Sequence, residues 1–318
     1  MKFYAVKVKK DIAEEKRREL IKKGLLLPAK VKKNERFVYF PVKKKIKGSI
    51  LMDFELEERK VLDVPFEIIG DIAIFELREN KSKEEKIKIA KDIMEVHKNV
   101  RSVFCKAGGV KGVFRTRKLE FVYGENRSET IHKETGCVFK LDVKRVYFSP
   151  RLQYERARIA KQIKNYEKIF VPFAGVGPFP IVIAKLNKDK NIEIYANELN
   201  PVAFKYLKEN VKLNKVKVNL IYGDAKKKLK VKKFKKFADR IIMPIPMSSE
   251  SFLDIPFYLG RKGCIVHFYH FSRCAEETIR LIKNFARKKR RKIEIIFSRE
   301  VRGYSKEISE FVVDFKIL

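Results

Sequence analysis

Residues 170–179 read FVPFAGVGPF, and this short stretch decides the fold. An apolar run typical of a buried strand comes first, and Gly175 and Gly177 follow it before a second apolar run begins at Phe179. In an open α/β sheet, a glycine loop between the first strand and the first helix lies at the carboxyl edge, where these folds bind their ligands. The stretch therefore predicts a ligand-binding loop in an α/β domain.

Downstream of residue 159, strand-like runs alternate with helix-like segments, as in an α/β domain. The helix at Pro201–Leu213 is well marked, because Asn200 can cap it and Pro201 suits a first helical position. We predict a Rossmann-like, mostly parallel seven-stranded sheet with an antiparallel final strand. The expected strands are Ile169–Val171, Ile192–Ala196, Val218–Tyr222, Arg240–Met243, Gly263–His270, Ile293–Ser298 and Ile308–Phe315.

The glycine loop does not fit the two commonest phosphate-binding patterns. A P-loop would require a Gly-Lys-Ser/Thr sequence, which the loop lacks. A dinucleotide fingerprint would require a small residue where Pro180 stands. Gly175 and Gly177 still let the backbone approach a nucleoside closely, without the cradle that a pyrophosphate needs.

Two acidic residues at the next strand ends narrow the choice. Glu198 in YANELNP follows the second strand, where a carboxylate can accept hydrogen bonds from both ribose hydroxyls. Asp224 in IYGDAK follows the third strand, where it can accept from an adenine amine. Either acid alone is as readily a loop or capping residue. The glycine loop and two acids in this order predict a methyltransferase that uses S-adenosyl-L-methionine.

The charge of the chain points to a polyanionic partner. Lys and Arg number 75 against 40 Asp and Glu, so the formal net charge is +35. A Lys-rich, heat-adapted surface is the alternative, but such surfaces raise Lys and Glu together. We therefore expect a nucleic acid partner. The start MKFYAVKVKK has no apolar signal core, and no stretch approaches the roughly 18 apolar residues of a membrane span, so we expect a cytoplasmic protein without membrane contact.

Before the α/β domain, the pattern predicts two smaller domains. Residues 1–55 are expected to form a small accessory α/β domain, with strands Phe3–Val8 and Phe37–Val42 around the helix Ile12–Lys23 in βαβ-like order. A charged stretch at residues 55–60 separates it from the rest.

Residues 66–150 are expected to form an α+β middle domain. It begins with a hairpin about Gly70-Asp71, continues with a helix at Ser82–Val96, and ends in β-rich segments broken by glycines. The methyltransferase domain then spans residues 151–318.

A specific resemblance lies just upstream of the glycine loop. Residues 132–160 read HKETGCVFKLDVKRVYFSPRLQYERARIA, preceded by GVFRTRKLEFVYGENR and followed by PFAGVGPF. Together these segments resemble the archaeal and eukaryotic tRNA (guanine-37 N1)-methyltransferase family over about residues 66–270. The resemblance implies an unknotted methyltransferase domain, a middle domain that helps form the active site, and an N-terminal domain that contacts distant parts of the tRNA. It also implies guanosine 37, beside the anticodon, as the acceptor.

The resemblance assigns catalytic roles that suit the chemistry. Guanine N1 carries a proton, so methyl transfer needs a base at N1 and a donor at O6. Glu155 matches the family's base position, and Arg115 matches the arginine that stabilises the O6 side. From helix spacing alone, Glu155 would be expected to form an ion pair with Arg158.

The resemblance also supplies two sets of binding positions. The cofactor-binding set is Tyr147, Arg156, Phe173, Ala174, Gly175, Gly177, Glu198, Leu199, Asp224, Ala225 and Pro244. The RNA-binding set is Arg115, Arg117, Asn126 and Arg151.

The sequence departs from the common family pattern at two strand ends. Val171 replaces an acid at the end of the first strand, and MPIPMSS places Pro244 where an Asn-x-Pro motif has its Asn, while Pro246 is retained. We count both prolines among the catalytic positions. MPIP-like motifs resemble the archaeal branch linked to wyosine biosynthesis, whose members act on C7 of 4-demethylwyosine in tRNA, besides or instead of guanine N1. A tRNA-Phe substrate is expected for that activity.

Other interpretations stay open. CIVHFYHFSRC, residues 264–274, resembles a zinc site, but His267 and His270 would point to opposite faces of a strand, so we expect no metal. The chain could instead be an aminocarboxypropyl transferase of the wyosine pathway, although the Pro-Arg-Leu of FSPRL favours methyl transfer. It could also be a non-catalytic RNA-binding relative, although Glu155, Glu198 and Asp224 argue against that. We expect a monomer.

Overall fold

The computed structural model describes residues 1–55, 62, 64–77, 79, 81–112, 114, 116–305 and 307–318, without the side chains of residues 109–111. The chain divides into two compact units, Met1–Asp63 and Val64–Leu318. The charged stretch expected to separate them falls mostly at residues 56–60, outside the described part. None of the described helices is long and apolar enough to cross a membrane.

The first unit is a four-stranded sheet with one helix. Its strands β1 (Lys2–Lys9), β2 (Lys32–Lys33), β3 (Phe37–Val42) and β4 (Ser49–Asp53) lie in the order β2-β3-β1-β4. After η1 (Lys10–Ile12), the helix α1 (Ala13–Lys22) buries Leu20 against Phe40 and Val42.

The βαβ-like order expected for this unit is wrong, because β1 pairs antiparallel with both β3 and β4. The reason is the return of the chain after Gly24, which takes a left-handed φ of 63°. The following segment already runs beside β3, where Leu27 N–H donates to Pro41 O. The chain therefore enters β3 from the opposite direction instead of crossing over the sheet.

The second unit begins with the hairpin expected about Gly70-Asp71. Strands β5 (Phe66–Ile69) and β6 (Ile72–Phe75) pair antiparallel in a sheet of order β5-β6-β7-β8. The helix expected at Ser82–Val96 is confirmed as α2 (Lys83–Val96), where Ser82 and Glu85 form a capping box. The remaining strands here are β7 (Ser102–Lys111), β8 (Thr116–Gly124), and a separate pair, β9 (Glu129–Glu134) and β10 (Cys137–Asp142).

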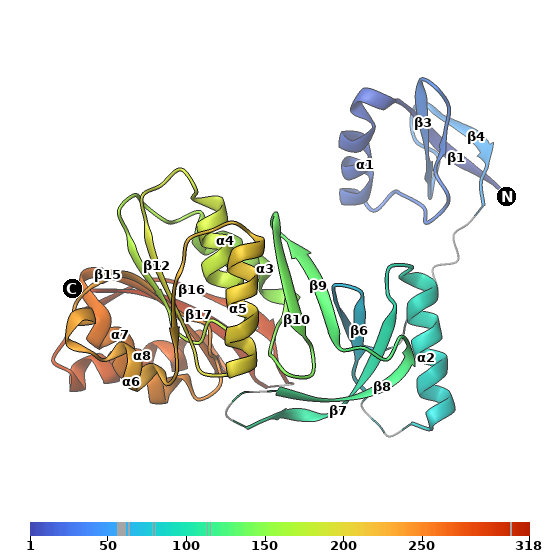
Figure 1. Cartoon of the computed structure of the whole chain (residues 1–318). Coiled ribbons are helices and arrows are strands. Elements are labelled where there is room, and N and C mark those ends of the chain that lie inside the picture. The colour runs from blue at the N-terminus through green and yellow to red at the C-terminus, as the bar shows by residue number, and fades with distance from the viewer. Residues whose placement is uncertain are drawn as a thin grey trace. The chain divides into compact units, whose positions relative to one another are not determined.

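The seven-stranded sheet predicted for the rest of the chain is confirmed (Figure 1). Its order is β13-β12-β11-β14-β15-β17-β16; the first five strands run parallel, and β17 lies antiparallel between β15 and β16. Its strands are β11 (Lys168–Val171), β12 (Glu193–Glu198), β13 (Asn219–Tyr222), β14 (Ala238–Met243), β15 (Gly260–Ser272), β16 (Ile293–Gly303) and β17 (Ser309–Ile317).

Helices cover both faces of this sheet. On one face, the core cluster contains side chains of α3 (Gln153–Ala160), α4 (Pro178–Leu186) and α5 (Pro201–Leu213) together with Phe139 of β10. On the other face, a second core cluster contains side chains of α6 (Ala225–Leu229), α7 (Asp254–Leu259) and α8 (Ala275–Lys288). Short 3-10 turns are η2 (Pro150–Leu152), η3 (Lys232–Phe234) and η4 (Ser249–Phe252).

Asn210 of α5 and Asn214, the C-cap of this helix, join it to the backbone of β10. The Asn214 side chain accepts from Val138 N–H at 2.8 Å and donates to Val138 O at 2.7 Å. Asn210 makes the same pair of bonds with Lys140, at 2.8 and 3.0 Å. Residues four apart on a helix share a face, as do residues two apart on a strand, so the amides match β10 one to one. The β9–β10 hairpin is thereby fixed to the helix layer of the seven-stranded sheet.

Candidate active site

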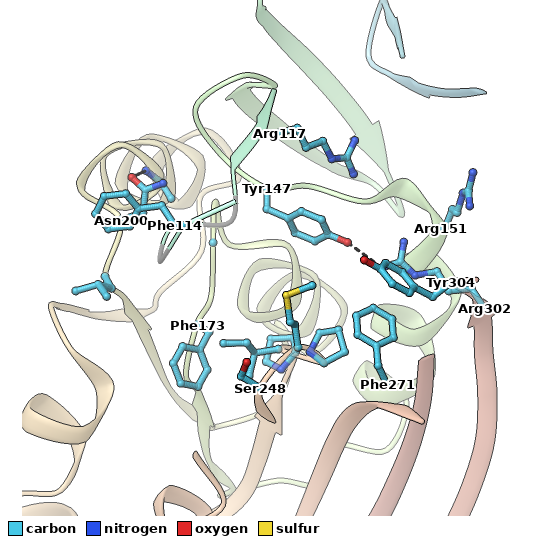
Figure 2. A pocket seen from close by; sticks show the side chains of 18 of the residues that line it. Phe114, Arg117, Tyr147, Arg151, Phe173, Asn200, Ser248, Phe271, Arg302 and Tyr304 are labelled. Carbon is cyan, nitrogen blue, oxygen red and sulfur yellow. Dashed lines mark hydrogen bonds between the residues drawn. The ribbon is translucent and has the colours of Figure 1, made fainter. Parts of the chain in front are cut away.

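A cavity of about 870 Å³ lies in the second unit, at the carboxyl edge of the seven-stranded sheet (Figure 2). The glycine loop supplies Phe173 and Gly175, and the loop after β14 supplies Pro244 and Pro246. Further walls come from side chains between residues 67 and 117 and from the C-terminal β16–β17 hairpin. Segments from the whole length of this unit therefore meet at one site.

The glycine loop holds an unusual backbone. Gly177 caps α4 with a φ of 96°, and a Cβ there would stand 2.6 Å from the Leu207 side chain, so only glycine fits. Phe173 has a left-handed φ of 59°, which is uncommon for a bulky residue. Its ring lines the cavity and packs edge-on against Phe252, with the centroids 4.7 Å apart. The loop therefore departs from ordinary backbone preference where it borders the cavity.

Glu198 lies where the sequence places it, at the end of β12 beside the glycine loop. Its Oε2 accepts from Gly175 N–H at 2.7 Å, and its Oε1 accepts from the N–H groups of Leu199 and Asn200 at 2.9 and 2.7 Å. Burial raises the pKa of Glu198, and these three backbone donors oppose the rise. A carboxylate has about four lone-pair positions, so Oε2 can still accept one hydroxyl. This remaining acceptor position fits a ribose hydroxyl of a nucleoside cofactor.

Asp224 lies at the end of β13, but it is not among the residues that line the cavity. It is the N-cap of α6, where one oxygen accepts from Lys227 N–H at 3.0 Å. Asn197, which the sequence analysis missed, connects this loop to β12 by donating to the carbonyls of Ile221 and Gly223. Its Oδ1 is buried without a hydrogen-bond partner. The only sequence signal was its place in YANELNP, next to Glu198.

The loop after β14 forms the floor of the cavity. Pro244 and Pro246 both line it, and Ser248 has a left-handed φ of 57°. Pro246 O accepts from Phe271 N–H at 3.4 Å and from the Ser249 hydroxyl at 3.3 Å. The two-proline loop is thus held to β15 through backbone groups.

Arg117 lines the cavity with little freedom to move. Its guanidinium forms an ion pair with Glu67, and its side chain is only 8% exposed. It also donates to Phe148 O at 3.2 Å and lies over the Tyr147 ring, 5.2 Å from the centroid. RNA binding by Arg117 stays a prediction, and it would compete with Glu67.

Arg156 lies behind the cavity wall, since it is 1% exposed and does not line the cavity. It forms two hydrogen bonds with Glu134, at 2.5 and 2.6 Å, and donates to Ser149 O. Arg156 thereby supports the segment that carries Tyr147, and its expected role at the cofactor stays a prediction. Arg151, by contrast, is exposed and lines the cavity.

Glu155 is buried at 1% exposure, just outside the cavity lining. Its Oε2 accepts from the Tyr269 hydroxyl at 2.8 Å and from Arg158 Nε at 3.0 Å, so the ion pair expected from helix spacing is present. Its Oε1 has no hydrogen-bond partner, although Arg299 Nη1 approaches to 3.6 Å. Hydrogen bonds thus fix Oε2, whereas Oε1 has no hydrogen bond and could accept a proton.

A chain of buried polar groups extends behind Glu155. Arg158 also pairs with Asp314 at 2.6 Å, and Asp314 pairs with His267 Nδ1 at 2.7 Å. His267 Nε2 lies 2.9 Å from Arg240, which can only donate, so the ring proton must be on Nδ1. Burial lowers the pKa of His267, in agreement with a neutral ring. Within the described residues, no group of three or more metal-ligating side chains is found.

The other sequence-derived positions differ in placement. Arg115 lies outside the described residues. Asn126 is exposed between β8 and β9, away from the cavity lining. Leu199 lines the cavity, whereas Ala174, Gly177 and Ala225 do not.

Sequence reasoning missed several lining residues. From the middle domain these are Glu67, Lys106 and Phe114, and from the C-terminal part of the chain they are Phe271, Arg302 and Tyr304. The rings of Phe271 and Tyr304 pack with their centroids 4.3 Å apart. Phe114 lies in GVFRTRK, which carries the family resemblance, and Phe271 lies in CIVHFYHFSRC, but neither segment indicated these side chains as lining residues. The other four belong to no motif that the sequence analysis identified.

Comparisons with known families match the chain along most of its length. A family described as the TRM5/TYW2 methyltransferase domain matches residues 130–296. The TYW2 N-terminal domain matches residues 49–127, and the tRNA methyltransferase 5 N-terminal domain matches residues 5–50.

Individual relatives are also similar. A tRNA (guanine(37)-N(1))-methyltransferase Trm5b from Pyrococcus abyssi is 39% identical over 98% of both chains. A tRNA (guanine(37)-N(1))/4-demethylwyosine(37)-methyltransferase Taw22 from Nanoarchaeum equitans is 45% identical over 50% of this chain and 51% of its own. A tRNA(Phe) (4-demethylwyosine(37)-C(7)) aminocarboxypropyltransferase from Methanocaldococcus jannaschii is 33% identical over 80% of this chain and 98% of its own.

Among solved structures, a complex of aTrm5 with tRNALeu superposes with a TM-score of 0.71 at 28% identity, and it covers 99% of this chain and 100% of the other. The similarity thus includes the methyltransferase sheet, the middle region and the N-terminal unit. This chain belongs to the TRM5/TYW2 methyltransferase family.

Proposed function

We propose that this protein transfers the methyl group of S-adenosylmethionine to N1 of guanosine 37 in tRNA. One observation carries the proposal: a single cavity extends from Glu198 and the glycine loop to Tyr147 and to Arg151 of FSPRL. Glu155 follows Arg151 by four residues and is buried. A methyltransferase needs a nucleoside site and an acceptor site in direct continuity.

The cofactor half of the cavity is the part formed by the glycine loop, Glu198 and the β14 loop. When bound, S-adenosylmethionine supplies an electrophilic methyl group. Glu198 would accept a ribose hydroxyl with its remaining lone pair, Gly175 would allow the backbone close approach, and Phe173 would cover the nucleoside. Asp224 would reach the adenine with the oxygen not used in capping α6.

The acceptor half is the part formed by Arg117, Tyr147, Arg151, Arg302 and Tyr304. Glu155 is proposed as the base that receives the N1 proton, because Tyr269 and Arg158 fix its Oε2 and leave Oε1 without a hydrogen bond. The partner at guanine O6 is proposed to be Arg115.

The tRNA would be held by charge and by stacking near the cavity mouth. Arg151 is exposed there, and one helical turn on, Tyr154 is 62% exposed with Arg299 lying over its ring at 4.7 Å. Alternating arginines and exposed aromatic rings are typical of surfaces that bind unpaired nucleotides. Residues 226–236, KKKLKVKKFKK, would add phosphate contacts.

The C7 position of 4-demethylwyosine is a second candidate acceptor. Pro244 favours it, since this residue lines the cavity where a common family member would present an amide. The absence of that side chain leaves room for a tricyclic base. Aminocarboxypropyl transfer is less favoured, because the aminocarboxypropyltransferase matches 80% of the chain and the Trm5b methyltransferase matches 98%.

Several finer points belong to the same proposal. The enzyme acts as a cytoplasmic monomer, with tRNA-Phe as substrate for any wyosine activity. Residues 1–55 serve as an accessory tRNA-contacting domain, residues 66–150 complete the active site, and residues 151–318 bind the cofactor.

The deciding experiment uses the full chain, labelled S-adenosylmethionine and tRNA-Phe with either guanosine or 4-demethylwyosine at position 37. Nucleoside analysis by mass spectrometry should find 1-methylguanosine in the first reaction. If only the second reaction gives a labelled product, the acceptor is the tricyclic base and not guanine N1. Transfer of the aminocarboxypropyl group instead of methyl would contradict the proposal.

A further inference from the structure

Arg302 occupies a place in the active site that no local motif predicts. It lies on β16, beyond residues 130–296 matched by the family's methyltransferase domain, and it lines the cavity. Its side chain is nevertheless only 18% exposed. A guanidinium this well buried must have its donors occupied.

All three nitrogens of Arg302 are used. Nη2 donates to the Tyr147 hydroxyl at 2.8 Å, and Nη1 donates to the Ser149 hydroxyl at 3.1 Å. Nε donates to Glu310 at 2.5 Å, and Glu310 is 1% exposed and is the register partner of Arg302 on β17. A planar fork with fixed donor directions suits this arrangement, whereas a lysine could not make the three bonds at once.

Tyr147 needs such an anchor because of where its ring lies. Its carbonyl is beside the glycine loop, 3.8 Å from where a Cβ of Gly175 would stand. Its ring extends across the cavity, between Phe173 on one side and Arg302 and Tyr304 on the other (Figure 2). A tyrosine ring on a loop could take other rotamers, and its hydroxyl bond to Arg302 selects this one.

We propose that Arg302 is a positioning residue, which fixes the Tyr147 ring as the wall between the cofactor half and the acceptor half of the cavity. The proposal rests on the proposed function, since it gives that wall a task in methyl transfer. Arg302 acts through Tyr147, with Glu310 holding the guanidinium in place. The C-terminal hairpin is therefore part of the active site and not only the edge of the sheet.

A double-mutant cycle tests this coupling. The variants are Arg302→Lys, Tyr147→Phe and the two combined, with Arg280→Lys as a control, because Arg280 lies exposed on α8, outside the cavity lining. Single-turnover methylation of tRNA and calorimetric binding of S-adenosylhomocysteine are measured on the full chain. Each single variant should lower the rate about tenfold to a hundredfold, as misplacement of a reacting group by about 1 Å does.

The combined variant should be no slower than the worse single variant, because both remove the same bond. Binding of tRNA should stay within about twofold, and Arg280→Lys should behave as the wild type. Glu310→Gln should reproduce part of the Arg302→Lys effect. An additive cycle, or an Arg302→Lys variant with the wild-type rate, would overturn the proposal.

A second measurement does not depend on catalysis. Fluorotyrosine can be incorporated and the Tyr147 fluorine resonance assigned by its loss in Tyr147→Phe. In Arg302→Lys this resonance should shift and narrow toward that of a freely rotating ring, while the melting temperature changes little. An unchanged resonance would contradict the anchoring even if the wild-type chain failed to methylate tRNA, and that failure alone would count against the proposed function.

Discussion

The two halves of the cavity are built in different ways. In the cofactor half, Glu198 is held by three backbone N–H groups, and Gly175 is only 23 residues away in sequence. In the acceptor half, side chains hold one another, and the bond from Arg302 to Tyr147 spans 155 residues. The first half is a property of one loop, and the second depends on the whole fold of the unit.

This difference has a functional meaning. Main-chain N–H groups remain when side chains are replaced, so this half should tolerate most substitutions other than that of Glu198 itself, which suits a cofactor shared by many enzymes. A network of side chains can be altered one residue at a time, so it suits the part of the site that selects the acceptor. Substitutions should therefore affect cofactor affinity in one half, and rate or acceptor choice in the other.

The largest effect is expected for Glu155→Gln, in the acceptor half. Loss of the base should lower single-turnover N1 methylation by about 10² to 10⁴, since general-base assistance typically contributes that much. Binding of cofactor and of tRNA should change little, because Gln retains the shape. Rapid-quench assays measure the rate, and Glu276→Gln, at an exposed position, is the control. A decrease in rate of less than about threefold would show that Glu155 is not the base.

Asp314→Asn tests how the acceptor half is supported. Burial raises the pKa of Asp314, but His267 and Arg158 outweigh it, so the pKa lies below its ordinary value. A lowered carboxyl pKa gives stability above the unfolded-state pKa of about 4, which is lost as the pH falls through the folded-state value.

The variant should therefore lose about 3 kcal/mol of unfolding free energy at pH 7, as removal of one partner of a buried ion pair does. The difference in unfolding free energy between the variant and the wild type should become smaller as the pH falls below about 4. Urea unfolding at a series of pH values measures both quantities. A gap that stays constant down to pH 3 would show that the charge of Asp314 is not what stabilises the fold.

Glu198→Gln tests the cofactor half. Gln keeps one acceptor, but its amide group faces backbone N–H donors, so the loop and the ribose site should both be disturbed. We expect the dissociation constant for S-adenosylhomocysteine to rise about tenfold to a hundredfold, or about 1.5 to 3 kcal/mol for a charged hydrogen-bond partner. Calorimetry gives this value, and tRNA affinity serves as the internal control. Equal losses for both ligands would mean that the two halves are not separable.

The smallest effect is expected for Tyr154→Ala, at the mouth of the acceptor half. Loss of one stacking ring should weaken tRNA binding about fivefold, at the low end of base–aromatic stacking. Tyr166→Ala is the matched control, because Tyr166 is 72% exposed but precedes β11 at the amino edge of the sheet, whereas the cavity lies at the carboxyl edge. Filter binding at two salt concentrations compares the variants. Equal weakening by the two substitutions would point to non-specific contacts.

The two halves of the cavity also differ in how far the sequence could predict them. The glycine loop, Glu198 and the helix after Asn200 were predictable, because the constraint on each is local. The N-terminal topology was not, since the direction of β3 depends on how the chain after Gly24 packs. Arg302 and Tyr304 could not be found either, because only the antiparallel pairing of β16 with β17 brings them to the cavity. The partner of Arg156 could not be predicted either, since Glu134 of β9 is brought to it by the fold.

The paired amides of Asn210 and Asn214 have a consequence for the protein at high concentration. A two-stranded ribbon such as β9–β10 would normally present β10 as a free edge, open to pairing with a strand of another molecule. The asparagine side chains occupy its N–H and carbonyl groups as a neighbouring strand would. The helix thus covers the edge of the hairpin, and replacing both asparagines by alanine should favour association between molecules.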